Sequence, residues 1–363
     1  MIKFFTFSFL FIIVVSIASC KFPQKPASGP EDQIIVFADS LEFEQLKTAL
    51  SSTFEKIIYT PQPEKIFILK RVDIESLDHY KRRKNIIFVA PLYTGSETSK
   101  YIHAVIDTNL EVQINTDSTI VISKYNLWAR NQLVTVLTAP TIKKLIKKIK
   151  GQSENLIYTY QKISDKRLYQ SLYNSHFEQK KIEAQFLKKY GWIIYVQADF
   201  QVAKDDSVNN FVWIRRSPNS EMERWIFIHW IDNASLAYLN ADSIKAVRDE
   251  VTKKFYRTAD DKGYVVIAKD YFTSSEINFN GRYTILTQGL WELNIKGMGG
   301  PFINYTFYDE KSKRIYMIDG SIFAPKYFKR NLIQQMDITV QSFLTKDELS
   351  QERKEDLLDA LDD

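Results

Sequence analysis

Apolar runs alternate with helix-like patterns over the first third of the chain. Residues 34–38 form a short apolar run suited to a buried strand. Asp39-Ser40 then begin a segment whose apolar residues recur at helical spacing. Further strand-like runs follow at 66–72, 85–90, 118–123 and 133–137. Strands that alternate with helices predict an N-terminal α/β-like domain over residues 33–137.

Residues 138–190 carry a helical pattern. Pro140 suits a first helical turn, and an apolar stripe at helical spacing follows it. The opposite face is basic, with lysines at positions 143, 144, 147, 148 and 150. Such a helix either packs on the domain with a solvated basic face or lies on anionic lipid. We favour the packed helix, because the stripe lacks the Trp or Phe that interfacial helices prefer.

From residue 191 the pattern changes to alternating apolar and polar positions, which is typical of antiparallel strands. Two hairpins are predicted, 211–216 with 225–231 around 217–220, and 302–308 with 315–319. A helix-like segment follows each hairpin, which raises the hypothesis of a duplicated strand-hairpin-helix unit. The sequence thus predicts an α+β fold whose C-terminal domain, residues 191–345, packs antiparallel hairpins on helices. Residues 346–363 form an acidic tail, either a solvated helix or a frayed end.

The N-terminus has the pattern of a bacterial lipoprotein leader. Lys3 precedes an apolar run, and small residues lead to Cys20, the single cysteine of the chain. This arrangement resembles a lipobox, which predicts a signal peptide over 1–19 and acyl chains, palmitate among them, on Cys20. The alternative is an ordinary leader with a chance cysteine. The proline-rich residues 20–32 then predict an extended tether.

Composition narrows the class of protein. The chain has 363 residues, is 45% hydrophobic and carries a formal charge of +5, so it folds and is too weakly basic to indicate nucleic acid as a partner. A single cysteine excludes an internal disulfide framework.

Motifs for catalysis are absent. The four histidines are dispersed, and no phosphate-binding or nucleophile motif occurs. The sequence therefore predicts no metal site, no cofactor and no catalytic residue, which leans against an enzyme.

The stretch 289–336 contains the candidate binding residues. Met298-Gly299-Gly300-Pro301 predicts a tight reversal whose amides could hold an anion or a ligand edge, although a purely structural turn or bulge between strands is the favoured alternative. Trp291 lies on a flanking strand and suits either a ligand site or the core. Lys329 and Arg330 lie at a helix start, where cations oppose the helix dipole. This pair predicts a carboxylate partner or an anionic ligand, with simple solvation as the alternative.

This stretch also carries a family resemblance. Residues 289–292, 298–302 and 319–326, followed by 329–331, resemble the C-terminal signature of the DUF4837 family, which are lipoproteins of Bacteroidota-type bacterial envelopes. The blocks 61–64, 83–86, 128–132 and 211–215 resemble further family blocks in the same order. The resemblance implies a location and an extent, but no activity.

Taken together, these features predict a lipid-anchored protein of the cell envelope, on the periplasmic face of the outer membrane. We expect it to act by binding or assembly, with an envelope protein or an anionic ligand as partner and the membrane contacted through the acyl chains. The alternative is an envelope hydrolase that acts on cell-wall or lipid material.

Overall fold

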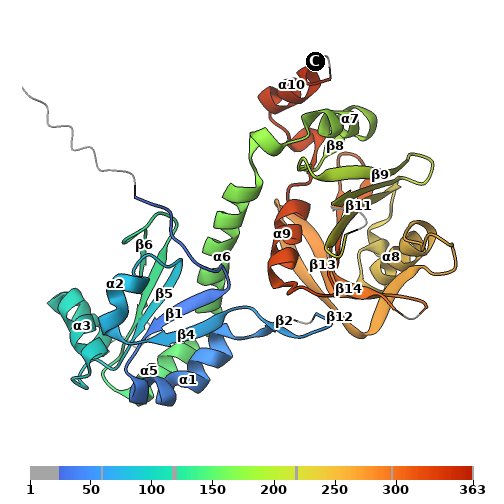
Figure 1. Cartoon of the computed structure of the whole chain (residues 1–363). Helices are drawn as coiled ribbons and strands as arrows, with labels where there is room; N and C mark the ends of the chain where they lie inside the picture. Colours follow the sequence, from blue (N-terminus) through green and yellow to red (C-terminus); the bar gives the residue numbers. More distant parts are fainter. Residues whose placement is uncertain (1–23, 59, 117–120, 217–219, 296, 362–363) are drawn as a thin grey trace, which may run out of the picture.

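The computed structural model describes residues 24–58, 60–116, 121–216, 220–295 and 297–361. The predicted signal peptide and Cys20 lie outside these residues. Two domains are joined by the long helix α6, Ser153–Leu172, as Figure 1 shows. In the described part of the chain, no helix has both the length and the apolar character needed to cross a membrane.

The N-terminal domain is built on a five-stranded sheet in the order β4-β1-β5-β7-β6. Its strands are β1 (Gln33–Phe37), β4 (Ile68–Val72), β5 (Asn85–Val89), β6 (Ile122–Tyr125) and β7 (Leu133–Leu137). All neighbours pair in parallel except β6, which is antiparallel to β7. The central strand β5 is buried along its whole length, as expected for a parallel strand covered on both faces.

Helices cover both faces of this sheet. On one side, α1 (Ser40–Phe54), α5 (Ile142–Gly151) and α6 bury their apolar residues on the strands. On the other side lie η1 (Ile74–Ser76), α2 (Leu77–Tyr80) and α3 (Glu97–Val105), followed by α4 (Thr108–Thr116). The sequence pattern did not predict α3 or α4. The lysine-rich α5 packs its apolar stripe against α1, so this stripe is buried within the domain.

The expected tether is docked over its described residues, 24–32. Backbone bonds join Ala27 N to the Arg130 carbonyl (2.8 Å) and Ser28 N to the Arg82 carbonyl (2.9 Å). Glu31 is buried and forms ion pairs with Arg167 and Lys84. The prolines keep this segment extended, and an extended chain can add backbone hydrogen bonds along the domain surface.

The C-terminal domain is built on a seven-stranded antiparallel sheet in the order β12-β13-β14-β15-β11-β10-β9. Its strands are β9 (Phe200–Asp206), β10 (Phe211–Arg216), β11 (Glu223–Asp232), β12 (Val265–Phe279), β13 (Arg282–Leu293), β14 (Gly299–Asp309) and β15 (Arg314–Phe323). The α+β prediction is therefore confirmed.

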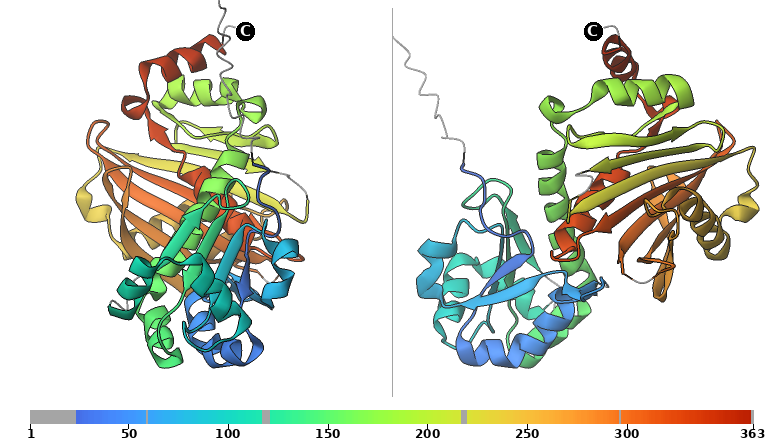
Figure 2. Two further views of the ribbon diagram at one scale, coloured as in Figure 1. Left: turned by 90° about the vertical axis from the view of Figure 1, so that its left-hand side faces the viewer. Right: turned by 45° about the vertical axis from the view of Figure 1, so that its right-hand side comes forward.

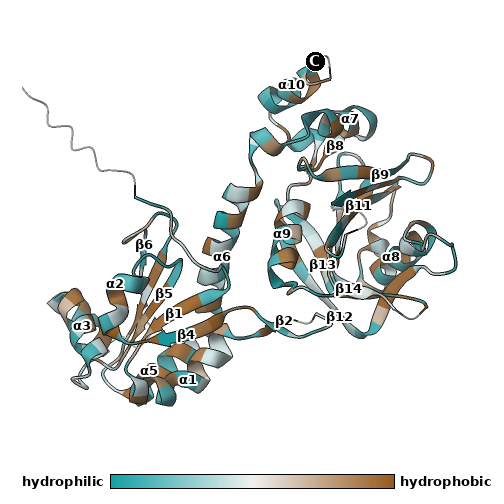
Figure 3. Ribbon diagram, viewed as in Figure 1, coloured by the Kyte–Doolittle hydropathy of each residue, from teal (hydrophilic) through white to brown (hydrophobic). Residues whose placement is uncertain are grey.

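Each face of this sheet is covered by its own helix. Helix α8 (Ala241–Phe255), preceded by η3 (Leu236–Tyr238), covers a core of aromatic side chains that includes Trp225 and Trp291. Helix α9 (Arg330–Val340) covers the opposite core. The right-hand view of Figure 2 shows α8 on the side of the sheet that faces away from α6. Figure 3 shows the apolar residues gathered on the strands and on the inner helix faces.

The positions of α8 and α9 on the sheet argue against the hypothesis of a duplicated unit. Both hairpins, β10–β11 and β14–β15, are followed by a helix, as the pattern indicated. However, α8 and α9 lie on opposite faces of the sheet. The two segments therefore share an order of elements but do not pack as copies of one unit.

Six further elements form a small layer at the end of the sheet. They are η2 (Ser175–Phe177), α7 (Lys180–Tyr190), β8 (Trp192–Ile193), β16 (Leu344–Thr345), η4 (Lys346–Glu348) and α10 (Gln351–Asp359). Strand β16 pairs with β8, and Leu357 of α10 is buried against α7. The described part of the acidic tail is therefore a packed helix rather than a frayed end.

Candidate functional site

Trp291, Gly300 and Pro301 are buried in the C-terminal domain. Trp291 is only 1% exposed, stacks near Trp225 and donates from Nε1 to the Ile322 carbonyl at 3.2 Å. Gly299, Gly300 and Pro301 lie in β14, where Gly300 pairs with Trp291 of β13. This arrangement favours the core interpretation of Trp291.

The predicted reversal at Gly299-Gly300 is wrong. The chain turns before these residues, where Gly297 has a φ of 135° and Met298 is partly exposed. Gly300 is required for another reason, since a Cβ atom there would lie 2.0 Å from the Ile322 carbonyl oxygen. Both turns and close contacts require glycine, and the sequence does not distinguish the two uses. Because Gly300 and Pro301 are buried, this motif offers no exposed amide cradle.

Lys329 and Arg330 meet a carboxylate from the other domain. Glu64, in the short hairpin of β2 (Ile57–Ile58) and β3 (Glu64–Lys65), is buried at the start of α9. Its oxygens accept from Lys329 N at 2.7 and 2.9 Å and from Arg330 N at 2.9 Å. A carboxylate from the N-terminal domain thus caps a C-terminal helix, which favours negative charge at this end.

The side chains of the same pair line the domain junction. Lys329 Nζ donates to Gln62 Oε1 at 2.9 Å, while the Arg330 guanidinium lies over the Phe67 ring. Burial lowers the pKa of Arg330. Arg330 also borders a cavity of about 470 Å³ between the domains, lined from β2, α6, β13 and α9.

In a doubly wound fold, ligands usually bind at the edge formed by the carboxyl ends of the parallel strands. In the N-terminal domain, side chains of the domain itself fill this edge. Asp39 follows β1 and accepts from Thr98 N of α3 at 3.0 Å, rather than capping α1. Glu42 accepts from Thr94 Oγ1 (2.5 Å) and Ser96 Oγ (3.0 Å). The two carboxylates thus accept hydrogen bonds from backbone and hydroxyl groups that would otherwise face a ligand.

A buried charged network lies beneath α8. Arg248 and Asp319 are both fully buried and form an ion pair at 2.7 Å. Ser321 and Asn304 complete the network, and the Arg248 guanidinium lies 3.7 Å from the centroid of the Phe302 ring. The Asp319-Gly-Ser part of the C-terminal signature therefore holds a helix to the sheet.

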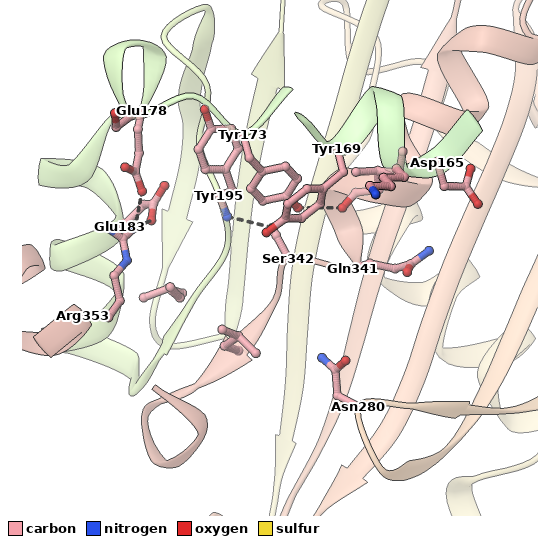
Figure 4. A pocket seen from close by; sticks show the side chains of 15 residues that line it. Asp165, Tyr169, Tyr173, Glu178, Glu183, Tyr195, Asn280, Gln341, Ser342 and Arg353 are labelled. Carbon is pink, nitrogen blue, oxygen red and sulfur yellow. Dashed lines mark hydrogen bonds and ion pairs between the residues drawn. The ribbon is translucent and has the colours of Figure 1, made fainter. Parts of the chain in front are cut away.

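A concave feature lies between α6, α7, α9, α10 and the β8–β16 pair. It is a cavity of about 680 Å³, which we call the tyrosine cavity, and Figure 4 shows its lining. The side chains that define it are Tyr169, Tyr173, Tyr195, Gln341, Ser342 and Arg353. Its volume falls within the range of about 300–1,000 Å³ that is usual for small-molecule sites.

Three tyrosines form a stack along this cavity. Tyr169 and Tyr173 stack with centroids 4.2 Å apart, and Tyr173 and Tyr195 lie 4.5 Å apart. The Tyr173 hydroxyl donates to the Ile338 carbonyl at 2.8 Å, and the Tyr195 hydroxyl donates to the Asn174 carbonyl at 3.0 Å. The stack is thereby fixed, while Tyr169 remains 54% exposed.

A cluster of two acids and one base closes one end of the cavity. Arg353 of α10 bonds to both Glu178 and Glu183, the latter at 3.0 Å. Glu183 also accepts from Val196 N at 2.8 Å. Burial, and then the neighbouring Glu178, raise the pKa of Glu183 to about 8. The cluster joins α10 to α7 and has few oxygens left for a substrate.

The tyrosine cavity and the interdomain cavity meet at Asp165 of α6, which lines both. Asp165 accepts from Gln334 of α9 at 2.6 Å, and burial raises its pKa. On the next turn of α9, Asp337 accepts from the Tyr305 hydroxyl at 2.5 Å, and burial raises its pKa as well. The contact between α6 and α9 therefore separates the two cavities.

Of the predicted site residues, Trp291, Gly300 and Pro301 are buried in the C-terminal domain, Gly299 is half-buried and Met298 is exposed. Lys329 and Arg330 lie at the domain junction. None of them lines the tyrosine cavity. Its residues come from segments between 165 and 353 and are of ordinary types, so the sequence offers no motif for them. Cys20 lies outside the described residues. Within the described ranges, no cluster of His, Cys, Asp and Glu side chains suits a metal ion.

Comparisons with known proteins divide the chain in the same way as the fold. Residues 178–342 match the model of DUF4837, a domain of unknown function, and include the C-terminal signature and the block 211–215. Residues 27–173 match the model of DUF8532, another domain of unknown function. The blocks 61–64, 83–86 and 128–132, which we compared with DUF4837, therefore lie outside the match to that family and inside the match to DUF8532. No curated protein matches the chain. Helix α10, which completes the tyrosine cavity, lies outside both matches.

Proposed function

For this chain, whose residues 178–342 belong to the DUF4837 family, we propose a role as a lipid-anchored envelope protein that binds a ligand in its tyrosine cavity. The anchor is formed by acyl chains on Cys20, and the protein faces the periplasm from the outer membrane. The ligand lies between α6, α7 and α9.

The tyrosine cavity itself is the observation that supports ligand binding most directly. A space of about 680 Å³ lined by fixed aromatic rings and polar side chains is the arrangement that small-molecule sites share. Its aromatic part is held by hydrogen bonds from tyrosine hydroxyls to backbone carbonyls, so the surface is preformed. A preformed surface lowers the entropic cost of binding.

The hydrogen bonds and ion pairs of Glu178 and Glu183 favour binding over catalysis. Glu183 is fully buried, and its two oxygens accept from Val196 N and from Arg353. Glu178 is engaged by the same guanidinium. A general acid or base must reach the proton that it transfers, and neither carboxylate is free to do so.

A hydrolase remains the second candidate, because the pKa of Glu183 is raised to about 8 beside a second carboxylate. A buried carboxyl group with a raised pKa is typical of a general acid. Incubation of wild type and Glu178→Gln with purified peptidoglycan tests this candidate. Release of soluble fragments by the wild type but not by the variant would favour it over binding.

The anchor is tested by radiolabelled palmitate. We expect Cys20→Ala to abolish incorporation of the label and to release the protein from the membrane fraction. Ser8→Ala, inside the apolar run of the leader, should behave as wild type. Labelling of Cys20→Ala would contradict the anchor.

The cavity is tested by filling it. Ser175 lines the cavity at an exposed position, so Ser175→Trp should block ligand entry at little cost to folding. Gln185→Trp, on an exposed position of α7 outside the cavity, is the matched control. Native mass spectrometry of protein purified from envelopes should detect a bound mass in wild type and control but not in Ser175→Trp. Equal spectra for all three proteins would contradict the proposal.

A further inference from the structure

The tyrosine stack presents one free aromatic face. Tyr173 is covered by Tyr169 on one side and lies against Tyr195 on the other, whereas Tyr169 is half exposed at the end of the stack. Figure 4 shows the three rings side by side, with Ser342 and Gln341 next to them. The face of an aromatic ring is electron-rich and attracts weakly positive C–H groups. A ligand with a flat array of C–H bonds would lie against Tyr169.

Neutral polar groups surround this face. Among the described residues, the side chains of Ser175 and Asn280 and the hydroxyl of Tyr169 have no hydrogen-bond partner, and all three line the cavity. Gln341 gives its amide N–H to Tyr305 and Asp337, which leaves its oxygen as an acceptor. The cavity thus offers both donors and acceptors, which suits a ligand rich in hydroxyl groups.

The buried charges of the cavity are paired with one another. Arg353 bonds to both Glu178 and Glu183, and burial raises the pKa of Glu183 to about 8. Asp165 and Lys166 also line the cavity, and the exposed Lys166 forms no ion pair among the described residues. A strongly acidic ligand would have to compete with two carboxylates for Arg353, and a strongly cationic ligand would find Glu178 and Glu183 already bonded to that arginine.

Resting on the proposed function, we infer that the tyrosine cavity binds a neutral oligosaccharide whose sugar ring stacks on Tyr169. The hydroxyl groups of the sugar bond to Ser175, Asn280 and Gln341. Such a ligand combines apolar ring faces with hydroxyl-bearing edges, which are the two features that the cavity lining offers.

The test is calorimetric titration of the full mature chain with defined probes. The neutral probes are maltotetraose, cellotetraose and chitotetraose, and the contrasting probes are tetragalacturonate, choline and laurate. We expect one neutral oligosaccharide to bind, and Tyr169→Ala to weaken it by about tenfold or more. Tyr169→Phe should keep most of the affinity because the ring remains. Tyr125→Ala, which removes a similarly exposed tyrosine from β6, is the control.

The outcomes separate this inference from the proposed function. Binding of only a charged or lipid probe, sensitive to Ser175→Trp, would overturn the sugar assignment and leave the cavity as a binding site. Sugar binding that is unchanged in both Tyr169→Ala and Ser175→Trp would overturn both. Absence of binding by every probe, together with absence of a bound mass in the envelope-purified protein, would also overturn both.

Discussion

Replacing Glu64, which caps α9, tests directly how far the C-terminal domain depends on the N-terminal domain. Glu64 belongs to the N-terminal domain and is separated from Lys329 by 265 residues, yet it accepts the first backbone N–H groups of α9. The N-cap residue of this helix, Lys329, makes no capping hydrogen bond with its own side chain. Replacing Glu64 by Ala removes the acceptor without altering any residue of the C-terminal domain.

The expected loss can be worked out from the contacts. Two buried backbone N–H groups lose their partner, and each costs about 1–3 kcal/mol when left unsatisfied. Loss of the negative charge at the helix start adds roughly 0.3–1 kcal/mol. The Glu64 carboxylate is itself buried, which carries a desolvation cost. Its removal therefore regains part of the free energy of unfolding that the lost bonds contribute. We expect Glu64→Ala to lower the free energy of unfolding by about 2–4 kcal/mol, and Glu64→Gln, which keeps an acceptor, by about 1 kcal/mol.

Urea unfolding followed by tryptophan fluorescence measures this loss. Five of the six tryptophans lie after residue 190, so the signal reports chiefly on the C-terminal domain. Glu44→Ala is the matched control, because Glu44 is an exposed acid of the same domain that pairs only with Lys47. It should change the free energy of unfolding by less than about 0.5 kcal/mol. If Glu64→Ala matched the control, the cap would contribute nothing and the reasoning would be refuted.

Two further predictions follow from single side chains. Because the pKa of Glu183 is raised from 4.5 to about 8 by folding, the folded chain holds a proton between these values that the unfolded chain lacks, and stability should fall as pH rises through this window. Glu183→Gln should flatten this slope in thermal melts at about pH 5 and about pH 8, and an unchanged slope would assign it to other groups. Gly300→Ala should destabilise the protein by roughly 3 kcal/mol or more, since its Cβ would meet the Ile322 carbonyl. Gly151→Ala, where nothing lies within 4 Å, should be neutral or stabilise by up to about 1 kcal/mol, and equal melting temperatures for the two variants would contradict the close contact.

The sequence predicted the parts of the fold that follow from continuous patterns. Apolar runs such as 85–90 are found as buried strands because a parallel strand covered on both faces must be apolar throughout. The sequence pattern did not predict helix α3. Its buried residues are Thr98, Ser99 and Ile102, and two of these three are polar, so the helix lacks a clear apolar stripe. Their hydroxyls are hidden by the fold, which the pattern of apolar residues does not show.

The candidate site was harder to predict for a different reason. Lys329 and Arg330 were recognisable because they oppose the dipole of the helix that they begin. The Glu64 carboxylate that lies there accepts from their backbone N–H groups, whereas Lys329 Nζ donates to Gln62. Which carboxylate it is depends on a contact between domains, which sequence spacing does not encode. The tyrosine cavity is formed by residues that are individually common and far apart in the chain, so it exists only once α6, α7, α9 and α10 have packed.

The ion pair of Arg248 and Asp319 bears on how many positions α8 could take. The helix also contacts the sheet through apolar residues such as Ile244 and Val251, and through hydrogen bonds of Thr252 and Asp249 with the backbone of β12, both at 2.8 Å. A slip by one helical turn, about 5.4 Å, would break these two bonds and leave both charges of the ion pair buried and apart, at a cost of about 3–5 kcal/mol for the pair alone. The ion pair and the two bonds to β12 therefore select one position of the helix. Replacing the ion pair by apolar residues of similar volume would leave the domain nearly as stable, with the helix held in place by its bonds to β12.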